Sequence, residues 1–116
     1  GSPYFGKDNR LIFMKQEEIK LTTQLLTTDW NLSLSSSDIN DQVLLGLLKE
    51  RIKWLLANDL TGLMNTFYRM DIPESIFMAS SEDVDPPMFL AEAVLKRTKQ
   101  KVATRLRYRE MNDYEN

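Results

Sequence analysis

The residues best suited to chemistry form one basic segment near the C-terminus. Residues 96–109 contain no acid and seven basic residues, namely Lys96, Arg97, Lys99, Lys101, Arg105, Arg107 and Arg109. A cationic helix binds phosphates and gains affinity by releasing counterions. Tyr108 would add a surface for stacking. Nucleic-acid binding through residues 96–109 is therefore one functional hypothesis.

A structural role for the same cations competes with phosphate binding and is favoured over it. Cations near a helix C-terminus complement the helix dipole, and they can also pair with acids on other helices. Residues 1–95 carry eight basic and fourteen acidic residues, and the whole chain has a net charge of −2. Because nucleic-acid-binding domains are usually basic overall, nucleic acid is the less favoured partner.

Catalytic and metal-binding residue types are scarce in this chain. It has no histidine and no cysteine, which removes the commonest general base, thiolate chemistry and cysteine-based zinc sites. Glu82, Asp83 and Asp85 are close together but lack the spacing of a calcium-binding loop. We therefore expect no enzymatic activity, no cofactor and no metal, with Asp85 capping a helix instead.

Arg69 is a further candidate for anion binding, because it lies near the end of a predicted helix. An ion pair with an acid of the final helix, such as Glu92, is the favoured interpretation.

The longest apolar pattern in the chain covers residues 41–73. Leucines and other apolar residues recur there at spacings of three and four, which predicts helix. Asp38 is the expected N-cap, with Asp41 in the first turn. One helix of about thirty residues is compatible with the pattern, but Asn58 and the aspartate after it favour a break into two helices.

The remaining segments complete an all-α prediction. Residues 14–27 suit a helix, although their threonines also suit a strand. Residues 30–37 are a predicted linker, residues 74–79 a short helical turn, and residues 88–109 the final helix, preceded by Asp85 and two prolines. The fold class is therefore a small helical bundle of about four helices plus one short helical turn.

The pattern along the chain predicts a single domain. Residues 1–13 are expected to be loop or disordered and partly derived from an expression vector, since Gly1 and Ser2 resemble a protease-cleavage remnant. Residues 14–110 form the domain, and residues 111–116 are expected to be a frayed tail.

Parts of residues 40–109 resemble a known group of proteins. The resemblance is carried by residues 68–74 (YRMDIPE), by Leu90 and Ala91, and by residues 100–105 (QKVATR). These segments are similar to a group of short, functionally uncharacterised bacterial proteins. The resemblance implies an all-helical fold and says nothing about activity.

A protein-interaction module is the favoured function, either as a homodimer or as an adaptor for another protein. Residues 43–56 are apolar over more than one helix face, which makes Trp54, Leu45 and Leu47 the candidate interface residues. The acidic body and the basic final helix could also pair across a two-fold axis. Without an apolar run long enough to span a bilayer or a signal peptide, we expect a cytoplasmic protein with no membrane association.

Overall fold

The computed structural model describes the backbone of residues 3–34 and 39–115, with side chains from 15–34 and 39–111. The regular structure in these ranges is entirely helical: α1 (Pro3–Trp30), α2 (Asp41–Asn58), α3 (Leu60–Arg69), α4 (Glu74–Ser80) and α5 (Pro86–Glu115). The predicted all-α bundle of four main helices and one short helix is confirmed.

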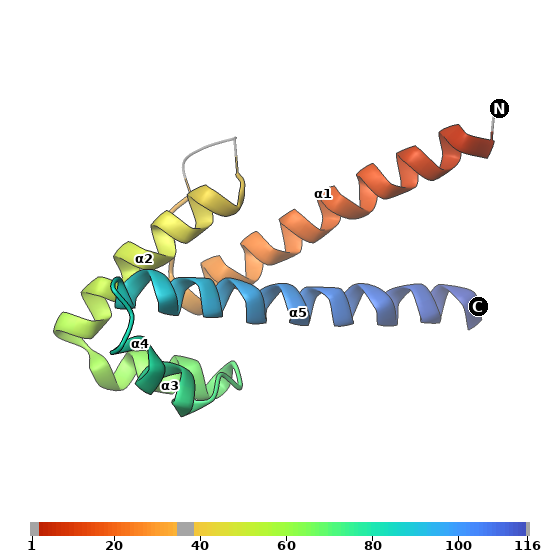
Figure 1. Cartoon of the computed structure of the whole chain (residues 1–116). Coiled ribbons are helices and arrows are strands. Elements are labelled where there is room, and N and C mark those ends of the chain that lie inside the picture. The colour runs from red at the N-terminus through yellow and green to blue at the C-terminus, as the bar shows by residue number, and fades with distance from the viewer. Residues whose placement is uncertain (1–2, 35–38, 116) are drawn as a thin grey trace.

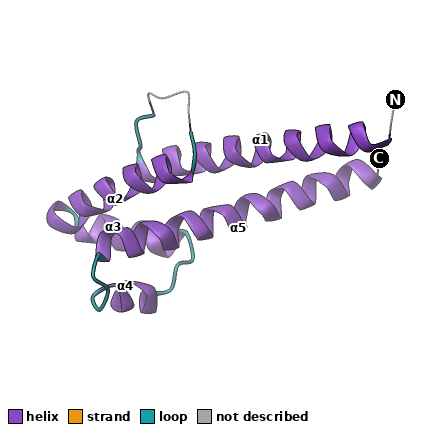
Figure 2. Cartoon of the chain, turned by 45° about the horizontal axis from the view of Figure 1, so that its top comes forward, coloured by secondary structure: helices purple, strands orange, loops and turns teal. Residues whose placement is uncertain are grey.

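The two longest helices, α1 and α5, run antiparallel, and their outer ends lie at the same end of the molecule (Figures 1 and 2). The shorter helices gather around the other end of α5 (Figure 1). Of these, α2 and α4 pack on α5, and α3 packs on α2. The result is an elongated molecule with a packed core at one end and a two-helix arm at the other.

The core draws on every long helix. Its buried apolar side chains come from α1, α2, α3, the turn after α3, and the first half of α5: Leu26, Trp30, Leu44, Leu48, Ile52, Leu55, Leu63, Phe67, Met70, Ile72, Leu90, Ala91, Val94 and Leu95. Trp30 meets Phe67 edge to face, with ring centroids 5.9 Å apart. The predicted linker residues Trp30 and Leu32 are thus buried, and they fasten the end of α1 to the core.

Helix α1 is longer than predicted. It begins at Pro3 and ends at Trp30, so the expected loop over residues 3–13 and the strand alternative for 14–28 are both wrong. Pro3 is compatible with the first helical position, and Gly6 inside the helix costs only about 1 kcal/mol relative to alanine. Neither residue was therefore a reliable signal for a loop. Residues 1–2 lie outside the described ranges.

Helix α2 begins with a different cap from the predicted one. The side-chain oxygen of Asn40 accepts a hydrogen bond from the backbone N–H of Val43 at 3.0 Å. Asp38 lies outside the described residues and two positions before the cap. Asp41 lies in the first turn, as predicted.

The predicted break near Asn58 is confirmed. The backbone N–H of Asp59 closes α2 by bonding to the carbonyl of Leu55 at 2.8 Å. The Asp59 side chain then accepts from the N–H of Gly62 at 2.9 Å and so caps α3. One residue therefore ends one helix and starts the next, because an aspartate oxygen satisfies an otherwise unpaired N–H group.

Helix α3 ends in a Schellman motif. Asp71 adopts a left-handed conformation with φ 59°. Its N–H bonds to the Tyr68 carbonyl, and the N–H of Ile72 bonds back to the Phe67 carbonyl at 3.0 Å. Pro73 follows as the N-cap of α4, which begins at the predicted residue, Glu74.

Helix α5 has the predicted N-cap, but it begins at Pro86, two residues before the predicted range, and it ends later than predicted. Asp85 caps it through the N–H of Met88 at 3.4 Å. Helical spacing places Leu90, Val94, Thr98, Val102 and Leu106 on one face. The first four are buried and Leu106 is half-buried. The helix continues to Glu115 rather than ending at Arg109, so the expected frayed tail is helical through that residue. The added residues include good helix formers such as glutamate and methionine.

Candidate functional site

The basic residues of α5 divide into a paired group and an unpaired group. Arg97 donates from Nε to the Met70 carbonyl at 2.9 Å and lies 3.7 Å from the Asp71 carboxylate. Its guanidinium therefore satisfies a carbonyl at the end of α3 that has no partner within that helix. Arg97 is a structural residue that joins α5 to the end of α3.

Two more cations of α5 pair with acids on other helices. The ammonium of Lys99 lies 2.5 Å from the Asp41 carboxylate at the start of α2. The guanidinium of Arg109 lies 3.5 Å from Glu17 on α1. These contacts follow the favoured structural interpretation, in which the basic helix answers acids of the other helices.

The other four cations, Lys96, Lys101, Arg105 and Arg107, have no side-chain partner in the described part of the chain. At 100° per residue, Lys96 and Arg107 project within about 20° of each other, whereas Arg105 projects on the opposite side of the helix. The unpaired cations therefore do not form one stripe along which a phosphate backbone could lie.

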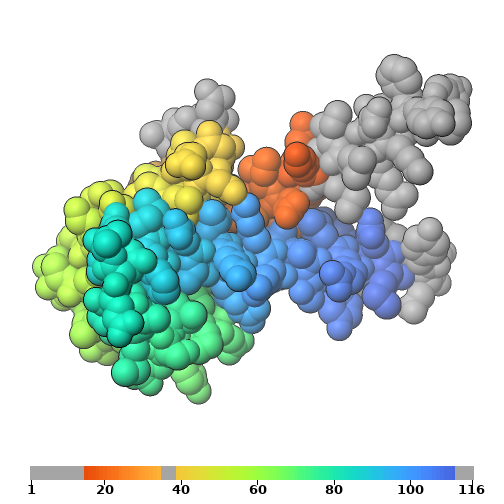
Figure 3. Space-filling model, in the orientation of Figure 1, coloured from red at the N-terminus to blue at the C-terminus, as the bar shows by residue number. Residues whose placement is uncertain are grey.

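The outer face of α5 is uncovered along much of its length. Figure 3 shows α5 crossing the front of the molecule between α2 and the segment formed by α3 and α4. A groove of about 470 Å³ follows α5 on its α2 side. Its apolar floor is formed by Leu45, Leu95 and Ala103, and its polar rim by Glu92, Lys96, Lys99 and Gln100.

Opposite charges lie near the two ends of this outer face. Glu92 and Arg107 are both exposed, and neither has a partner among the described residues. Fifteen residues separate them, or about 22 Å along the helix axis, and they project within about 60° of each other. The outer face of α5 therefore offers an unpaired acid at one end and an unpaired base at the other.

The three predicted interface residues of α2 do not form one surface. Leu45 lies in the groove beside α5. Leu47 and Trp54 are seven residues apart and share the opposite flank of α2. Trp54 is 52% exposed and its ring lies 5.0 Å from the Arg51 guanidinium. The side chain of Trp54 therefore lies at the surface of the molecule and not in its core.

Arg69 does not pair with Glu92 in the described structure, so that prediction is wrong. Its guanidinium donates to Thr66 Oγ1 at 3.3 Å. Arg69 is exposed, and at 100° per residue it projects on the side of α3 opposite to the buried Phe67. An ion pair between α5 and the end of α3 does form, but the arginine is Arg97 on α5 and the acid is Asp71 at the end of α3.

The acidic loop before α5 caps the first turn of that helix. Asp85 accepts from the Lys49 ammonium at 2.7 Å as well as from Met88. The hydrogen bond from Lys49 holds the pKa of Asp85 below its usual value of 3.8. Asp83 accepts from the backbone N–H of Asp85 at 2.9 Å. No group of three acids positioned to hold a metal occurs within the described residues.

The comparisons with known proteins leave the function to be argued from the chain itself. No family model, curated protein or solved structure matches it. The resemblance of residues 40–109 to short bacterial helical proteins therefore stays a prediction. Among the described helices, none combines the length and the apolarity that crossing a membrane requires.

Proposed function

We propose that this chain is a protein-interaction module that binds a second copy of itself through the outer face of α5. The observation that carries the proposal is the pair of exposed opposite charges on that face, Glu92 and Arg107, neither of which has a partner among the described residues. The absence of cysteine suits a reducing setting, so the proposed location is the cytoplasm. An adaptor that presents the same face to another protein is the alternative form of this function.

This charge pattern is complementary to itself when two copies are related by a two-fold axis. If two copies of α5 cross antiparallel with the axis between Lys99 and Gln100, Glu92 faces Arg107 of the second copy. Symmetry then places Arg107 opposite Glu92 of the second copy, so both charges are satisfied twice. Parallel pairing would place like charges together and is disfavoured.

The residues near the proposed axis also suit a close helix crossing. In this register Lys96 lies opposite Ala103 of the second copy, where a small side chain lets the helices approach. The lysine stem can cover apolar surface while its ammonium stays in water. Leu45 and Leu95 supply apolar area in the adjoining groove. The contact is thus modest in area and charged at its ends, which predicts a reversible dimer.

Sedimentation velocity over a range of micromolar concentrations tests the proposal. We expect the weight-average sedimentation coefficient to rise with concentration and the association to weaken when salt is added, because exposed ion pairs are screened. A monomer at every concentration would remove the homodimer. A pull-down with the wild type and with Glu92→Arg as the control would then test the adaptor form.

Nucleic-acid binding through residues 96–109 is the second candidate. It would depend on Lys96, Lys101, Arg105 and Arg107, the cations without a partner among the described residues. Phosphate binding should fall steeply with added salt. A gel shift at low salt that shows no complex with DNA or RNA would remove this candidate. A complex that survives Lys96→Glu and Lys101→Glu would locate binding on another surface.

A further inference from the structure

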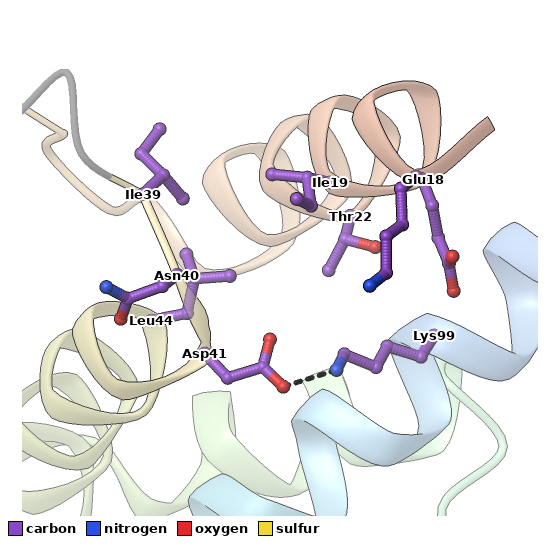
Figure 4. A pocket seen from close by; sticks show the side chains of 9 residues that line it. Glu18, Ile19, Thr22, Ile39, Asn40, Asp41, Leu44 and Lys99 are labelled. Atoms are coloured by element: carbon purple, nitrogen blue, oxygen red, sulfur yellow. Dashed lines mark hydrogen bonds and ion pairs between the residues drawn. The ribbon is translucent and has the colours of Figure 1, made fainter. Parts of the chain in front are cut away.

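A second cavity lies where α1, the start of α2 and the middle of α5 meet, and Lys99 separates it from the groove on the outer face of α5. Its volume is about 450 Å³. Figure 4 shows side chains from all three helices around it, with Ile19 and Thr22 on α1, Leu44 on α2 and Lys99 on α5. This volume lies within the range of small-molecule sites and far exceeds that of one water molecule.

The hydroxyl of Thr22 is the unusual feature of this cavity. Thr22 is 2% exposed, and its Oγ1 has no hydrogen-bond partner among the residues that the structure describes. Thr23 and Thr27 on the same helix, by contrast, each donate to the carbonyl four residues earlier. Buried hydroxyls are nearly always paired, because an unpaired one has lost its bonds to water without replacement. A ligand oxygen in the cavity would supply the missing partner.

The remaining lining residues define what kind of ligand fits. Ile19, Ile39 and Leu44 contribute apolar wall. Two lysines and two acids line the cavity, so their formal charges cancel. One of each, Lys99 and Asp41, already pair with each other at 2.5 Å (Figure 4). The described part of the lining therefore has no excess charge that would select an ionic ligand.

We propose that this cavity binds a small neutral molecule with an apolar body and one hydroxyl or carbonyl oxygen. The apolar body lies against Ile19, Ile39 and Leu44, and the oxygen accepts a hydrogen bond from Thr22 Oγ1. Glu92 and Arg107, which carry the proposed dimer contact, do not line this cavity, whereas Lys99 lines both the cavity and the groove on the outer face of α5.

Cyclohexanol is the probe for this site, titrated into the full chain and followed by amide chemical shifts in two-dimensional NMR. The shifts should move at Ile19, Thr22 and Leu44, and stay unchanged around Trp54. Thr22→Val keeps the shape and removes the hydroxyl, so it should weaken binding about three- to ten-fold, the effect of one neutral hydrogen bond. Thr23→Val is the matched control, since the Thr23 hydroxyl bonds to the Ile19 carbonyl; its affinity should equal that of the wild type.

Three results would overturn the proposal. The first is that cyclohexanol changes no amide chemical shift at the cavity residues, which would show that the cavity does not bind it. The second is equal affinity in Thr22→Val and the wild type, which would remove the hydroxyl from recognition. The third uses Ile39→Phe, which enlarges a side chain of the cavity wall and leaves the Thr22 hydroxyl in place, and which provides a test if Thr22→Val does not fold. Unchanged binding in Ile39→Phe would place the probe elsewhere.

Discussion

Two glycines in neighbouring helices provide a sharp test of how α2 and α3 are separated. A methyl group added at Gly46 would meet nothing within 4 Å. Alanine loses less backbone entropy than glycine on folding. Gly46→Ala is therefore expected to raise the free energy of unfolding by about 0.5–1 kcal/mol.

The same substitution at Gly62 meets the cap of α3. The added methyl would lie 2.3 Å from Asp59 Oδ2 and 2.8 Å from its Cγ, so the aspartate must leave its position. Loss of an N-cap costs about 0.5–2 kcal/mol, which offsets the gain of about 1 kcal/mol from alanine. We expect Gly62→Ala to leave stability unchanged or to lower it.

Urea unfolding followed by far-ultraviolet circular dichroism measures both variants against the wild type. The control is Gly62→Ala in an Asp59→Ala background. There no cap remains to displace, and alanine should stabilise the protein as it does at position 46. If Gly62→Ala stabilised the protein as much as Gly46→Ala with Asp59 intact, Asp59 would not cap α3. The structural account of the break after Asn58 would then be wrong.

Two further predictions concern contacts that join the helices. The Lys49 hydrogen bond lowers the pKa of Asp85 in the folded protein, so the Asp85 carboxylate contributes its full stabilisation above about pH 4 and loses it as the pH falls through the folded pKa. Asp85→Asn should therefore flatten that part of a plot of urea midpoint against pH. An unchanged slope would contradict the hydrogen bond between Lys49 and Asp85. Arg97→Met should lower the free energy of unfolding by about 1–3 kcal/mol, because it leaves the Met70 carbonyl without its partner. Lys96→Met, its exposed neighbour, should change stability by less than about 0.5 kcal/mol, and equal effects of the two in thermal or urea unfolding would refute a structural role for Arg97.

Local features of the fold could be predicted because their causes are local. The stripe from Leu90 to Val102 follows from helical spacing, and Asp85 before two prolines is a helix start by short-range chemistry. The break after Asn58 also has a local cause, because Asp59 caps α3 with its own side chain. The apolar pattern that predicted α3 runs as far as Pro73, yet the helix ends at Arg69, just before Asp71. The left-handed conformation of Asp71 is harder to predict for an aspartate than for a glycine.

The candidate site was harder to predict because it depends on which helices meet. The basic segment was evident from composition, but nothing in its spacing says that Arg97 reaches the end of α3 or that Lys99 reaches Asp41. The sequence does not distinguish Leu45 from Leu47, since both are apolar residues of α2. Only the position of α5 shows that Leu45 lies in the groove and Leu47 does not. Thr22 gave no signal at all, because an unpaired hydroxyl is visible only when its surroundings are known.

Exchange of the two charges on the outer face of α5 tests the proposed function most directly. Glu92→Arg replaces two attractive pairs across the two-fold axis with two repulsive ones, and Arg107→Glu does the same with the opposite sign. At the usual strength of exposed ion pairs, each single variant should dimerise about ten- to hundred-fold more weakly than the wild type.

The two single variants complement each other when they are mixed. In the mixed dimer, the arginine introduced by Glu92→Arg faces the glutamate introduced by Arg107→Glu, and the unchanged Arg107 of the first chain faces the unchanged Glu92 of the second. Because every pair is attractive again, we predict that sedimentation velocity shows two weakly associating samples alone and a heterodimer of wild-type strength in the equimolar mixture. A mixture that associates no better than its components, or single variants that dimerise as the wild type does, would contradict self-association through α5.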